Sequence, residues 1–454
     1  MDTRQVRRAS PAWTTGFACL TVCAVAALAA VVLFLAVAPA ARAASGDLAW
    51  RRLVVGPSNG SAAYLAAAAA PKGGVYAAGY VFNATGDFLA DRYTANGRRL
   101  WLRSLDFSLH AYDAVRAATT DRRGDLVVAG QVDYPSPSQA EAIVEYGPGG
   151  KLKWVRYFRD TGAGQATQLA TDARGDVYVA TSTVSNDIAL IKYSSSGSRR
   201  WVRRYAQPGD DQPRGVAVDA AGNVYVTGFS FSTVSSYDVV TFSYSPAGHR
   251  RWLHRWDGPA SGDDQGFGLA VTPAGAVYVA GTSTGITTGP DAVVLKYNTR
   301  GGLSWARSYS SAGAFGDEFE SIALLRNGDV AATGYTSPGG AQDVLVARLS
   351  PTGHTRWRQT YNGPDNLADQ GSFVAGDPSG AVYVAGTSVG AATSTDILTL
   401  KFDSAGHLSW AQRETSAGAV IDFPQGLVVT GAGVYVAGEE STAPNVAVLL
   451  KYRP

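Results

Sequence analysis

Aspartates recur at two fixed positions of a repeated unit in this chain of 454 residues, and such rows of carboxylates could do two kinds of chemistry. An aspartate occupies each of the two positions in six units. Hard cations such as Ca²⁺ take about 6–8 oxygen ligands, which carboxylates supply. Alternatively, an aspartate at a strand entrance accepts backbone N–H bonds, as in Asx turns. The row before the first predicted strand comprises Asp113, Asp211, Asp264, Asp317, Asp369 and Asp422, and the row before the third comprises Asp87, Asp187, Asp238, Asp291, Asp343 and Asp396.

The first row is the candidate Ca²⁺ site, and no other cofactor is expected. Ala62 and Gly164 replace the aspartate in the two remaining units. Repetition at identical positions favours the structural interpretation, because a binding site normally breaks the symmetry of a repeat. Loops before the first and third strands of an up-and-down meander share one face, and that face also has the longer predicted loops, 229–237, 282–290 and 387–395. Binding residues tend to lie on such loops.

Other motifs do not predict catalysis. Gly-x-Ser-x-Gly occurs at 281–285 and 386–390, but a nucleophile elbow needs a strand, a sharp turn and a helix. Here the motif ends a predicted strand and leads into a loop. Three of the five histidines share one turn position on different units, too far apart to ligate one metal. The histidines are His110, His249, His254, His354 and His407. No catalytic residue is therefore assigned.

Basic residues flank the predicted fourth strand of several units. Positive charge on an exposed edge strand discourages pairing with another sheet, which is the first interpretation. Attraction to anionic envelope polymers is the second. The formal net charge of only +2 argues against nucleic-acid binding. The groups are Arg98, Arg99 and Arg103; Lys151, Lys153 and Arg156; Arg199, Arg200, Arg203 and Arg204; and Arg250, Arg251 and Arg255.

The elements that position these residues follow a repeat. A strand-like core recurs eight times between Val75-Tyr76 and Val434-Tyr435, at steps of 47–53 residues. Periods of this size indicate a propeller, solenoid or array. A tryptophan keeps the same period and is predicted to pack blade on blade. These tryptophans are Trp50, Trp101, Trp154, Trp201, Trp252, Trp305, Trp357 and Trp410.

One unit, 211–256, contains four β-rich runs separated by Gly/Pro/Asn/Asp turns, which predicts a four-stranded antiparallel meander. The last unit lacks a tryptophan strand, whereas the segment from Asp47 to Val55 has a tryptophan but no preceding strands. The N-terminal segment should therefore supply the outer strand of the last blade. These features predict a single all-β, eight-bladed propeller. Seven blades with one irregular unit, or two smaller propellers, are the alternatives.

Residues 238–252, followed by Asp264-Gln265 and by 275–283, resemble the bacterial β-propeller repeat family known as SBBP. The resemblance extends over about nine tenths of the chain and implies an exported propeller. That family's name implies seven blades, one fewer than counted here. The Gly-x-x-x-Trp spacing, as from Gly248 to Trp252, resembles the tryptophan-docking repeats of quinoprotein-like propellers. In those proteins the tryptophan locks adjacent blades together, and this spacing does not imply a quinone site.

Residues 1–43 are predicted to be an export signal, and residues 44–454 the propeller. Arg4, Arg7 and Arg8 precede an uncharged run, and Ala41-Arg42-Ala43 forms an A-x-A cleavage site. The run is also long enough for an uncleaved membrane anchor. Either alternative places the propeller outside the cytoplasm. The only cysteines, Cys19 and Cys23, lie in this leader, so the propeller has no disulfide.

The sequence thus favours a non-catalytic binding or scaffold module, secreted or at the cell surface. Its expected partner is a protein, glycan or envelope polymer, and contact with a membrane is expected only through an uncleaved leader. An enzyme or cofactor protein of the quinoprotein-like or polysaccharide-acting kind is the alternative. It would need units whose loops differ chemically from the rest, such as those with Asp133-Tyr134-Pro135 and Glu141 or with 317–320. A self-associating surface-layer protein is the third interpretation.

Overall fold

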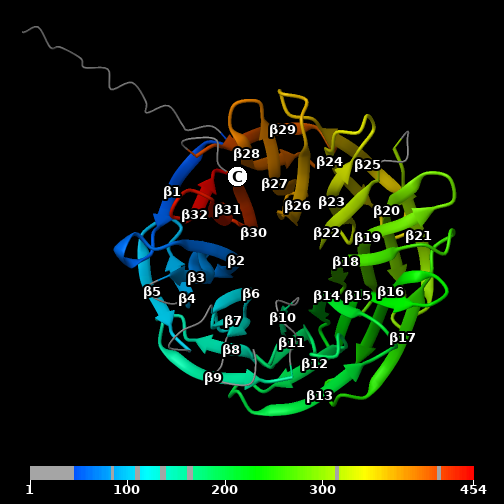
Figure 1. Ribbon diagram of the computed structural model, residues 1–454, viewed down its shortest axis with the longest axis horizontal. Coiled ribbons are helices and arrows are strands. Elements are labelled where there is room, and N and C mark those ends of the chain that lie inside the picture. The colour runs from blue at the N-terminus through cyan, green and yellow to red at the C-terminus, as the bar shows by residue number, and fades with distance from the viewer. Residues whose placement is uncertain are drawn as a thin grey trace, which may run out of the picture. The chain divides into compact units, whose positions relative to one another are not determined.

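The computed structural model describes residues 45–82, 86–107, 113–132, 140–160, 167–311, 316–416 and 421–454. These residues form eight four-stranded antiparallel sheets, arranged as blades around a central channel (Figure 1). The predicted all-β, eight-bladed propeller is confirmed. The predicted leader, with Cys19 and Cys23, lies outside the described residues. In the described part of the chain, helix is limited to two 3₁₀ turns, η1 (Pro57–Asn59) and η2 (Pro71–Gly73), and neither has the length and apolar character needed to span a bilayer.

The strands of a blade follow in chain order from the channel to the rim (Figure 1). The innermost strands are β2 (Ala62–Ala70), β6 (Ala114–Thr120), β10 (Gln168–Thr171), β14 (Asp211–Val218), β18 (Asp264–Val271), β22 (Glu318–Leu324), β26 (Asp369–Gly376) and β30 (Asp422–Thr430). The second strands are β3 (Gly74–Phe82), β7 (Leu126–Val132), β11 (Val177–Ser182), β15 (Val224–Ser232), β19 (Val277–Gly285), β23 (Val330–Thr336), β27 (Val382–Gly390) and β31 (Gly433–Glu440).

The third and fourth strands complete each sheet toward the rim. The third strands are β4 (Gly86–Tyr93), β8 (Ala140–Tyr146), β12 (Ile188–Tyr193), β16 (Ser236–Tyr244), β20 (Gly289–Tyr297), β24 (Asp343–Leu349), β28 (Ser394–Phe402) and β32 (Val446–Tyr452). The fourth are β5 (Arg99–Leu105), β9 (Leu152–Phe158), β13 (Arg199–Tyr205), β17 (Arg250–Trp256), β21 (Leu303–Tyr309), β25 (Thr355–Tyr361), β29 (Leu408–Glu414) and β1 (Leu48–Val54).

The second strand of each blade is buried on both faces because it lies between two neighbouring blades. In β19, Val277 and Val279 pack into a core shared with the preceding blade. Tyr278 and Ala280 point the other way, into a core shared with the following blade. Side chains of a strand alternate between its two faces, so one apolar run serves two interfaces. A chain of such interfaces holds the ring together.

A tryptophan clasp joins each blade to the next at the rim. Trp101 donates its indole N–H to the carbonyl oxygen of Pro148 at 2.9 Å, in the turn between β8 and β9. Gly150 in that turn has a φ of 79°, and a Cβ placed on it would lie 2.8 Å from two ring atoms of Trp101. Arg103 completes the clasp by donating from Nε to the oxygen of Gly150 at 2.8 Å. Glycine is required there both by its conformation and by the contact.

The same clasp recurs around the ring. Indole N–H groups reach the next blade's turn from Trp50, Trp154, Trp201, Trp305 and Trp357, and Trp410 reaches Ser45. Guanidinium groups bond the turn glycine from Arg52, Arg156, Arg203 and Arg307. Arg103, Arg156 and Arg203 therefore make inter-blade contacts, a role that the edge-protection interpretation missed. Trp252 differs, because its indole nitrogen has no hydrogen-bond partner among the described residues.

The ring closes through its two ends, as predicted from the incomplete first and last units. β1 pairs antiparallel with β32 and supplies the outer strand of the last blade. Ser45 donates from its hydroxyl to the oxygen of Pro454 at 2.7 Å, and the N–H of Gly46 donates to Arg453 at 3.0 Å. Gly46 lies against the ring of Trp410, so it takes the place of the turn glycine of the clasp.

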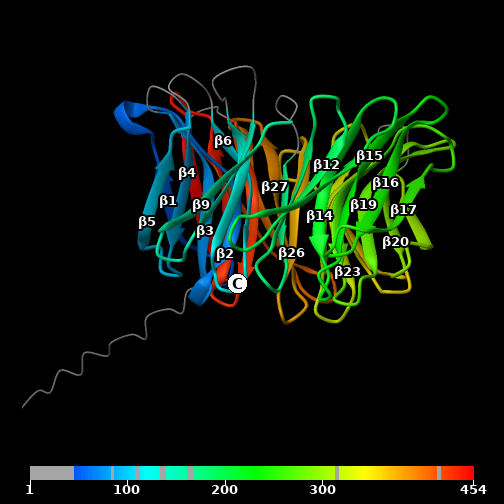
Figure 2. The same ribbon diagram turned by 90° about the horizontal axis from the view of Figure 1, so that it is seen from below.

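Three predicted long loops are wrong. The segment 229–237 is mostly strand, because β15 continues to Ser232 and β16 begins at Ser236. The equivalent hairpins of two other blades, β19–β20 and β27–β28, are extended in the same way. Pairing continues through polar side chains there, which the sequence pattern assigned to loops. These hairpins project on one side of the ring (Figure 2).

Candidate functional site at the channel mouth

Among the described residues, seven blades have a β-bulge near the beginning of the inner strand. In β14 the register with β15 shifts between Pro213 and Gly215, which leaves Arg214 as the extra residue. Bulges re-aim a side chain and are frequent beside active sites. The equivalent extra residues form what we call the bulge ring: Leu65, Arg116, Arg214, Phe267, Glu320, Ser372 and Gln425.

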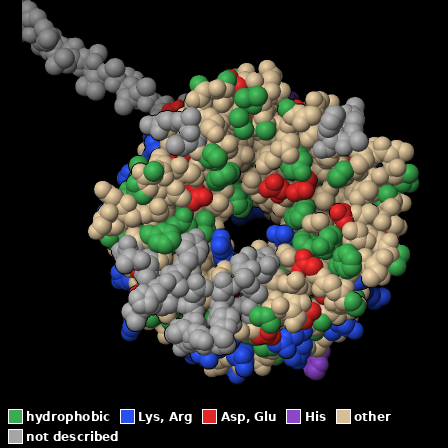
Figure 3. All heavy atoms as spheres, in the orientation of Figure 1, with side chains coloured by type: hydrophobic (Ala, Val, Ile, Leu, Met, Phe, Trp, Pro, Cys, Tyr) green, Lys and Arg blue, Asp and Glu red, His purple; other side chains and the backbone are tan. Residues whose placement is uncertain are grey.

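The bulge ring lines the channel. Arg214 is exposed, whereas its neighbours Pro213 and Gly215 are buried. The inner strand has its free edge toward the channel, so a side chain exposed there faces the channel. Figure 3 shows this opening at the centre of one face, with basic and acidic side chains at its rim.

A cavity of about 380 Å³ lies inside this mouth. It is lined by inner-strand residues from several blades, among them Arg116, Thr167, Phe373 and Gln425. Small-molecule sites typically have volumes of about 300–1,000 Å³. The cavity is therefore large enough for one or two sugar-sized groups, with a cationic, an aromatic and three neutral polar side chains on its wall.

Two features give the opposite side of the mouth a different chemistry. The guanidinium of Arg214 lies over the rings of Phe229, at 5.3 Å, and Phe267, at 6.0 Å. Such stacking holds a cation in a fixed orientation. On β22, burial and the neighbouring Glu320 raise the pKa of Glu318 to about 7. Burial also raises the pKa of Glu320 itself.

A further buried carboxyl group adjoins Arg116. Glu141 on β8 accepts a hydrogen bond from the hydroxyl of Thr167 at 2.9 Å. Burial raises the pKa of Glu141 to about 8, although Arg116 and Thr167 act in the opposite direction. Glu141 and Glu318 belong to the two units whose sequences differ most from the repeat. Residues 133–135 of the first of these units lie outside the described residues.

The first aspartate row makes backbone contacts. Each of its carboxylates is buried and accepts an N–H bond from the loop that precedes its inner strand. The bonds run from Phe107 to Asp113 (3.0 Å), Gln207 to Asp211 (2.7 Å), Gly258 to Asp264 (2.5 Å), Ser311 to Asp317 (2.6 Å), Gly363 to Asp369 (2.6 Å) and Ser416 to Asp422 (3.0 Å). Each carboxylate thus stabilises its own strand entrance, and the six lie on six different blades.

The two aspartate rows meet between blades, which the sequence reasoning missed. Carboxylates of the second row on one blade raise the pKa of first-row carboxylates on the next, as Asp187 does for Asp211 and Asp396 does for Asp422, although burial is the larger cause. Between β16 and β18, ligand atoms of Asp238, Asp257 and Asp264 all lie within 4.8 Å of one another. The two rows belong to different strands of different blades, so their meeting depends on how the blades pack.

The remaining motifs lie apart from the channel mouth. Both Gly-x-Ser-x-Gly segments lie wholly within β19 and β27, so the strand-turn-helix geometry of a nucleophile elbow is missing there. His249, His354 and His407 occupy turns on three blades, and His254 lies in β17. His110 lies outside the described residues. Among the described residues, no histidine joins a group of three potential metal ligands.

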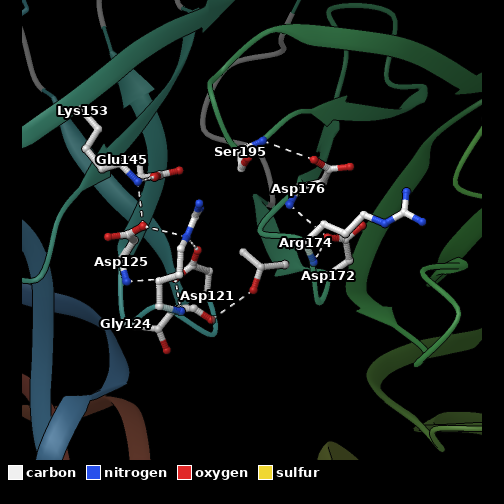
Figure 4. Close-up of polar contacts among 12 residues, drawn as sticks. Asp121, Gly124, Asp125, Glu145, Lys153, Asp172, Arg174, Asp176 and Ser195 are labelled. Carbon is white, nitrogen blue, oxygen red and sulfur yellow. Dashed lines mark hydrogen bonds and ion pairs between the residues drawn. The ribbon is translucent and has the colours of Figure 1, made fainter.

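The ends of the blades opposite the channel mouth carry turns and ion pairs. Figure 4 shows Lys153 between Asp125, at 2.6 Å, and Glu145. On the next blade, the Oδ1 atom of Asp172 accepts N–H bonds from Arg174 at 2.9 Å and Asp176 at 3.0 Å. The carboxylates of these aspartates accept hydrogen bonds from their own turns or form ion pairs with neighbouring cations. They are therefore assigned a structural role.

Comparisons with known proteins agree with this fold. Residues 200–230 match a family described as beta-propeller repeat, SBBP. The crystal structure of Sqt1 from Chaetomium thermophilum is 13% identical, with a TM-score of 0.56 over 90% of this chain and 99% of that chain. The Dos1 propeller is 10% identical, with a TM-score of 0.53 over 88% of this chain and 93% of that chain. No curated protein sequence matches significantly. At these identities the two structures show the fold alone.

Proposed function

We propose that the protein is an exported, non-catalytic binding propeller that holds a segment of an acidic glycan or envelope polymer in its channel mouth. The bulge ring carries this proposal. Its residues occupy one backbone position in seven blades, yet their side chains include aliphatic, aromatic, cationic, anionic and neutral polar types. By contrast, the clasp tryptophan is present in all eight blades, and the strand-entrance aspartate is present in six. Variation at a fixed position on a rigid scaffold is typical of recognition.

The chemistry of the mouth favours an acidic, hydroxyl-rich ligand. Arg116 and Arg214 offer planar, permanently charged groups that bind carboxylate, phosphate or sulfate in a bidentate manner. Phe267 and Phe373 are half-buried and offer flat apolar surface. Gln168 and Gln425 supply hydrogen-bonding groups for hydroxyls. Since the pKa of Glu318 is raised to about 7, this group is partly protonated near neutral pH and repels an anion less.

The first described residues and the bulge ring lie at different ends of the blades. Ser45 and Gly46 lie with the turns that contact the tryptophans, whereas the bulge ring lies near the opposite ends of the inner strands.

Paired arginine variants test the proposal. The double variant Arg116→Ala/Arg214→Ala removes both channel arginines, and Arg98→Ala/Arg200→Ala removes two exposed arginines from the outer edge. Binding is measured by titration calorimetry with alginate and hyaluronate, and with neutral dextran. We expect at least a tenfold loss of affinity in the first variant only, because each truncated contact to a charged group costs about 1.5–3 kcal/mol. Equal losses in both variants, or no binding to either acidic polymer, would contradict it.

A second candidate function rests on Glu318. A carboxyl group whose pKa is about 7, beside a second carboxyl group, could act as a general acid or base on a bound polysaccharide. Incubation of the wild type and of Glu318→Gln with alginate and hyaluronate, followed by assay of reducing ends and unsaturated products, decides this point. Cleavage that Glu318→Gln abolishes would replace the binding proposal with an enzyme. Intact polymer in both reactions supports the binding module.

A further inference from the structure

A cluster between the fourth and fifth blades lies outside the bulge ring. It consists of Asp238 on β16, Asp264 at the beginning of β18, and Asp257 in the loop before β18. Their nearest carboxylate oxygens are within 4.8 Å of one another, and only Asp257 is exposed. Three carboxylates this close repel one another unless a cation or a proton compensates them.

Two buried oxygen atoms at the cluster make no hydrogen bond of good geometry. Ser283 is 1% exposed and lies opposite Asp264 in the register of β18 and β19. Neither the hydroxyl of Ser283 nor Oδ1 of Asp264 makes a hydrogen bond of good geometry among the described residues, although Ser283 lies close enough to lower the pKa of Asp264 against the effect of burial. A Cβ placed on Gly258 would lie 2.3 Å from the former and 2.5 Å from the latter, so both oxygens face the same place beside Asp257. Buried polar groups are normally paired, so unpaired oxygens indicate a missing partner.

The charges of the cluster suit a divalent ion. Arg255 donates to Oδ2 of Asp238 from Nε at 3.0 Å and from Nη2 at 2.6 Å, and neutralises one carboxylate. Three carboxylates and one guanidinium leave a formal charge of −2. The backbone N–H of Gly258 fixes Asp264 through its other oxygen at 2.5 Å. The free oxygen is thereby held in position before any ligand binds.

We propose that this junction binds a divalent cation of the Ca²⁺ type, through oxygens of Asp238, Asp257, Asp264 and Ser283. Water would complete a shell of about 6–8 oxygens. The proposal narrows the predicted row of candidate sites to one of its six members, Asp264. What distinguishes this junction is that the loop residue Asp257 reaches the other two carboxylates. Its place is taken by Ala206 in the loop before β14 and by Asn362 in the loop before β26. The equivalent Asp106, in the loop before β6, belongs to no such group of three among the described residues.

Asp257→Asn is the decisive variant. Asp257 is exposed, and its one described hydrogen bond comes from the hydroxyl of Ser261 at 3.2 Å, so its loss should leave the fold intact. Asp211→Asn is the matched control, because Asp211 also accepts a backbone N–H while Ala206 offers no carboxylate. Ca²⁺ binding to the purified protein is followed by calorimetry and by Tm with and without EDTA. Tb³⁺ luminescence sensitised by Trp256, the neighbour of Asp257, locates the ion.

The wild type should bind one Ca²⁺, with a rise in Tm of about 2–5 °C at saturation. Asp257→Asn should weaken binding about tenfold or more, because affinity depends on the number of charged ligands. Asp211→Asn should lower Tm in EDTA yet keep the response to Ca²⁺. Trp256→Phe should abolish the Tb³⁺ signal and keep the calorimetric binding. The proposal is overturned if the wild type binds no Ca²⁺, or if Asp257→Asn binds as the wild type does.

Discussion

At the scale of residues, the buried aspartates of the first row and the buried Glu141 have different roles. Asp113 and its five counterparts accept backbone N–H bonds, which explains their repetition without any ligand. Glu141 is a departure from the repeat: it is buried, its one described bond is to Thr167, and its pKa is raised to about 8. A carboxyl group that remains protonated in the folded state lowers stability when the pH is high enough to ionise it.

Glu141 should make stability depend on pH. Its pKa is about 4.5 when unfolded and about 8 when folded, so its contribution is complete below the first value and is lost as the pH rises to the second. The slope in that interval is at most about 1.4 kcal/mol per pH unit. Glu141→Gln should therefore flatten the fall in unfolding free energy between pH 5 and 8. Differential scanning calorimetry at several pH values checks this, and parallel curves for the two proteins would refute it.

At the scale of elements, each blade depends on its neighbour through the tryptophan clasp. Seven indole N–H groups reach an acceptor at the next turn, and the eighth, on Trp252, has none in the described part of the chain. His254 stands two residues after Trp252, where Arg307 follows Trp305. The clasp between the fourth and fifth blades therefore lacks both of its hydrogen bonds.

This difference predicts that replacing a clasp tryptophan by phenylalanine lowers the free energy of unfolding by different amounts at different blades. Trp305→Phe removes the hydrogen bond to the oxygen of Pro351 at 3.2 Å and part of the ring contact. Trp252→Phe removes only ring contact and relieves an unpaired N–H. We expect Trp305→Phe to be the more destabilising by about 1 kcal/mol, measured by urea unfolding. Equal losses would show that the indole N–H adds nothing to the clasp.

The bulge and the junction between the two aspartate rows could not be predicted from the sequence pattern, for a physical reason. A bulge is defined by its partner strand, and one extra residue leaves no mark in a run such as 211–218. Its signal was variation at the third position after the aspartate, as at Arg214, Phe267 and Ser372. The hairpin of β15 and β16 was also misread, because polar residues such as Ser230 sit at paired positions.

At the scale of the whole molecule, the period predicted the number of blades and the closure of the ring. A single four-stranded unit cannot bury its two faces alone and must pack against the next unit. The number of blades and the closure of the ring could therefore be predicted from the repeat. Closure depends on one strand, β1, whose pairing with β32 covers the edge that the last blade would otherwise expose. Unpaired edges promote aggregation.

Removal of β1 should therefore have an effect out of proportion to its length. A variant that begins at residue 56 should elute as soluble aggregate in size-exclusion chromatography and lose its cooperative thermal transition. A variant that begins at residue 45 retains β1 and should be monomeric with an undisturbed transition, since the contacts of Ser45 and Gly46 with the last residues remain. A monomeric, cooperatively unfolding variant without β1 would mean that the ring closes by other contacts.

The central claim is that the clasps and the strand-entrance aspartates hold the ring together, whereas the bulge ring binds an acidic polymer. It is tested most directly by changing the non-serine members of the bulge ring, from Leu65 to Gln425, to serine in one variant, and then measuring its Tm and its affinity for alginate. The account predicts a Tm within about 5 °C of the wild type, because Leu65 is the only changed side chain that packs against a buried apolar cluster, together with loss of binding. Collapse of the fold, or binding that persists unchanged, would contradict it.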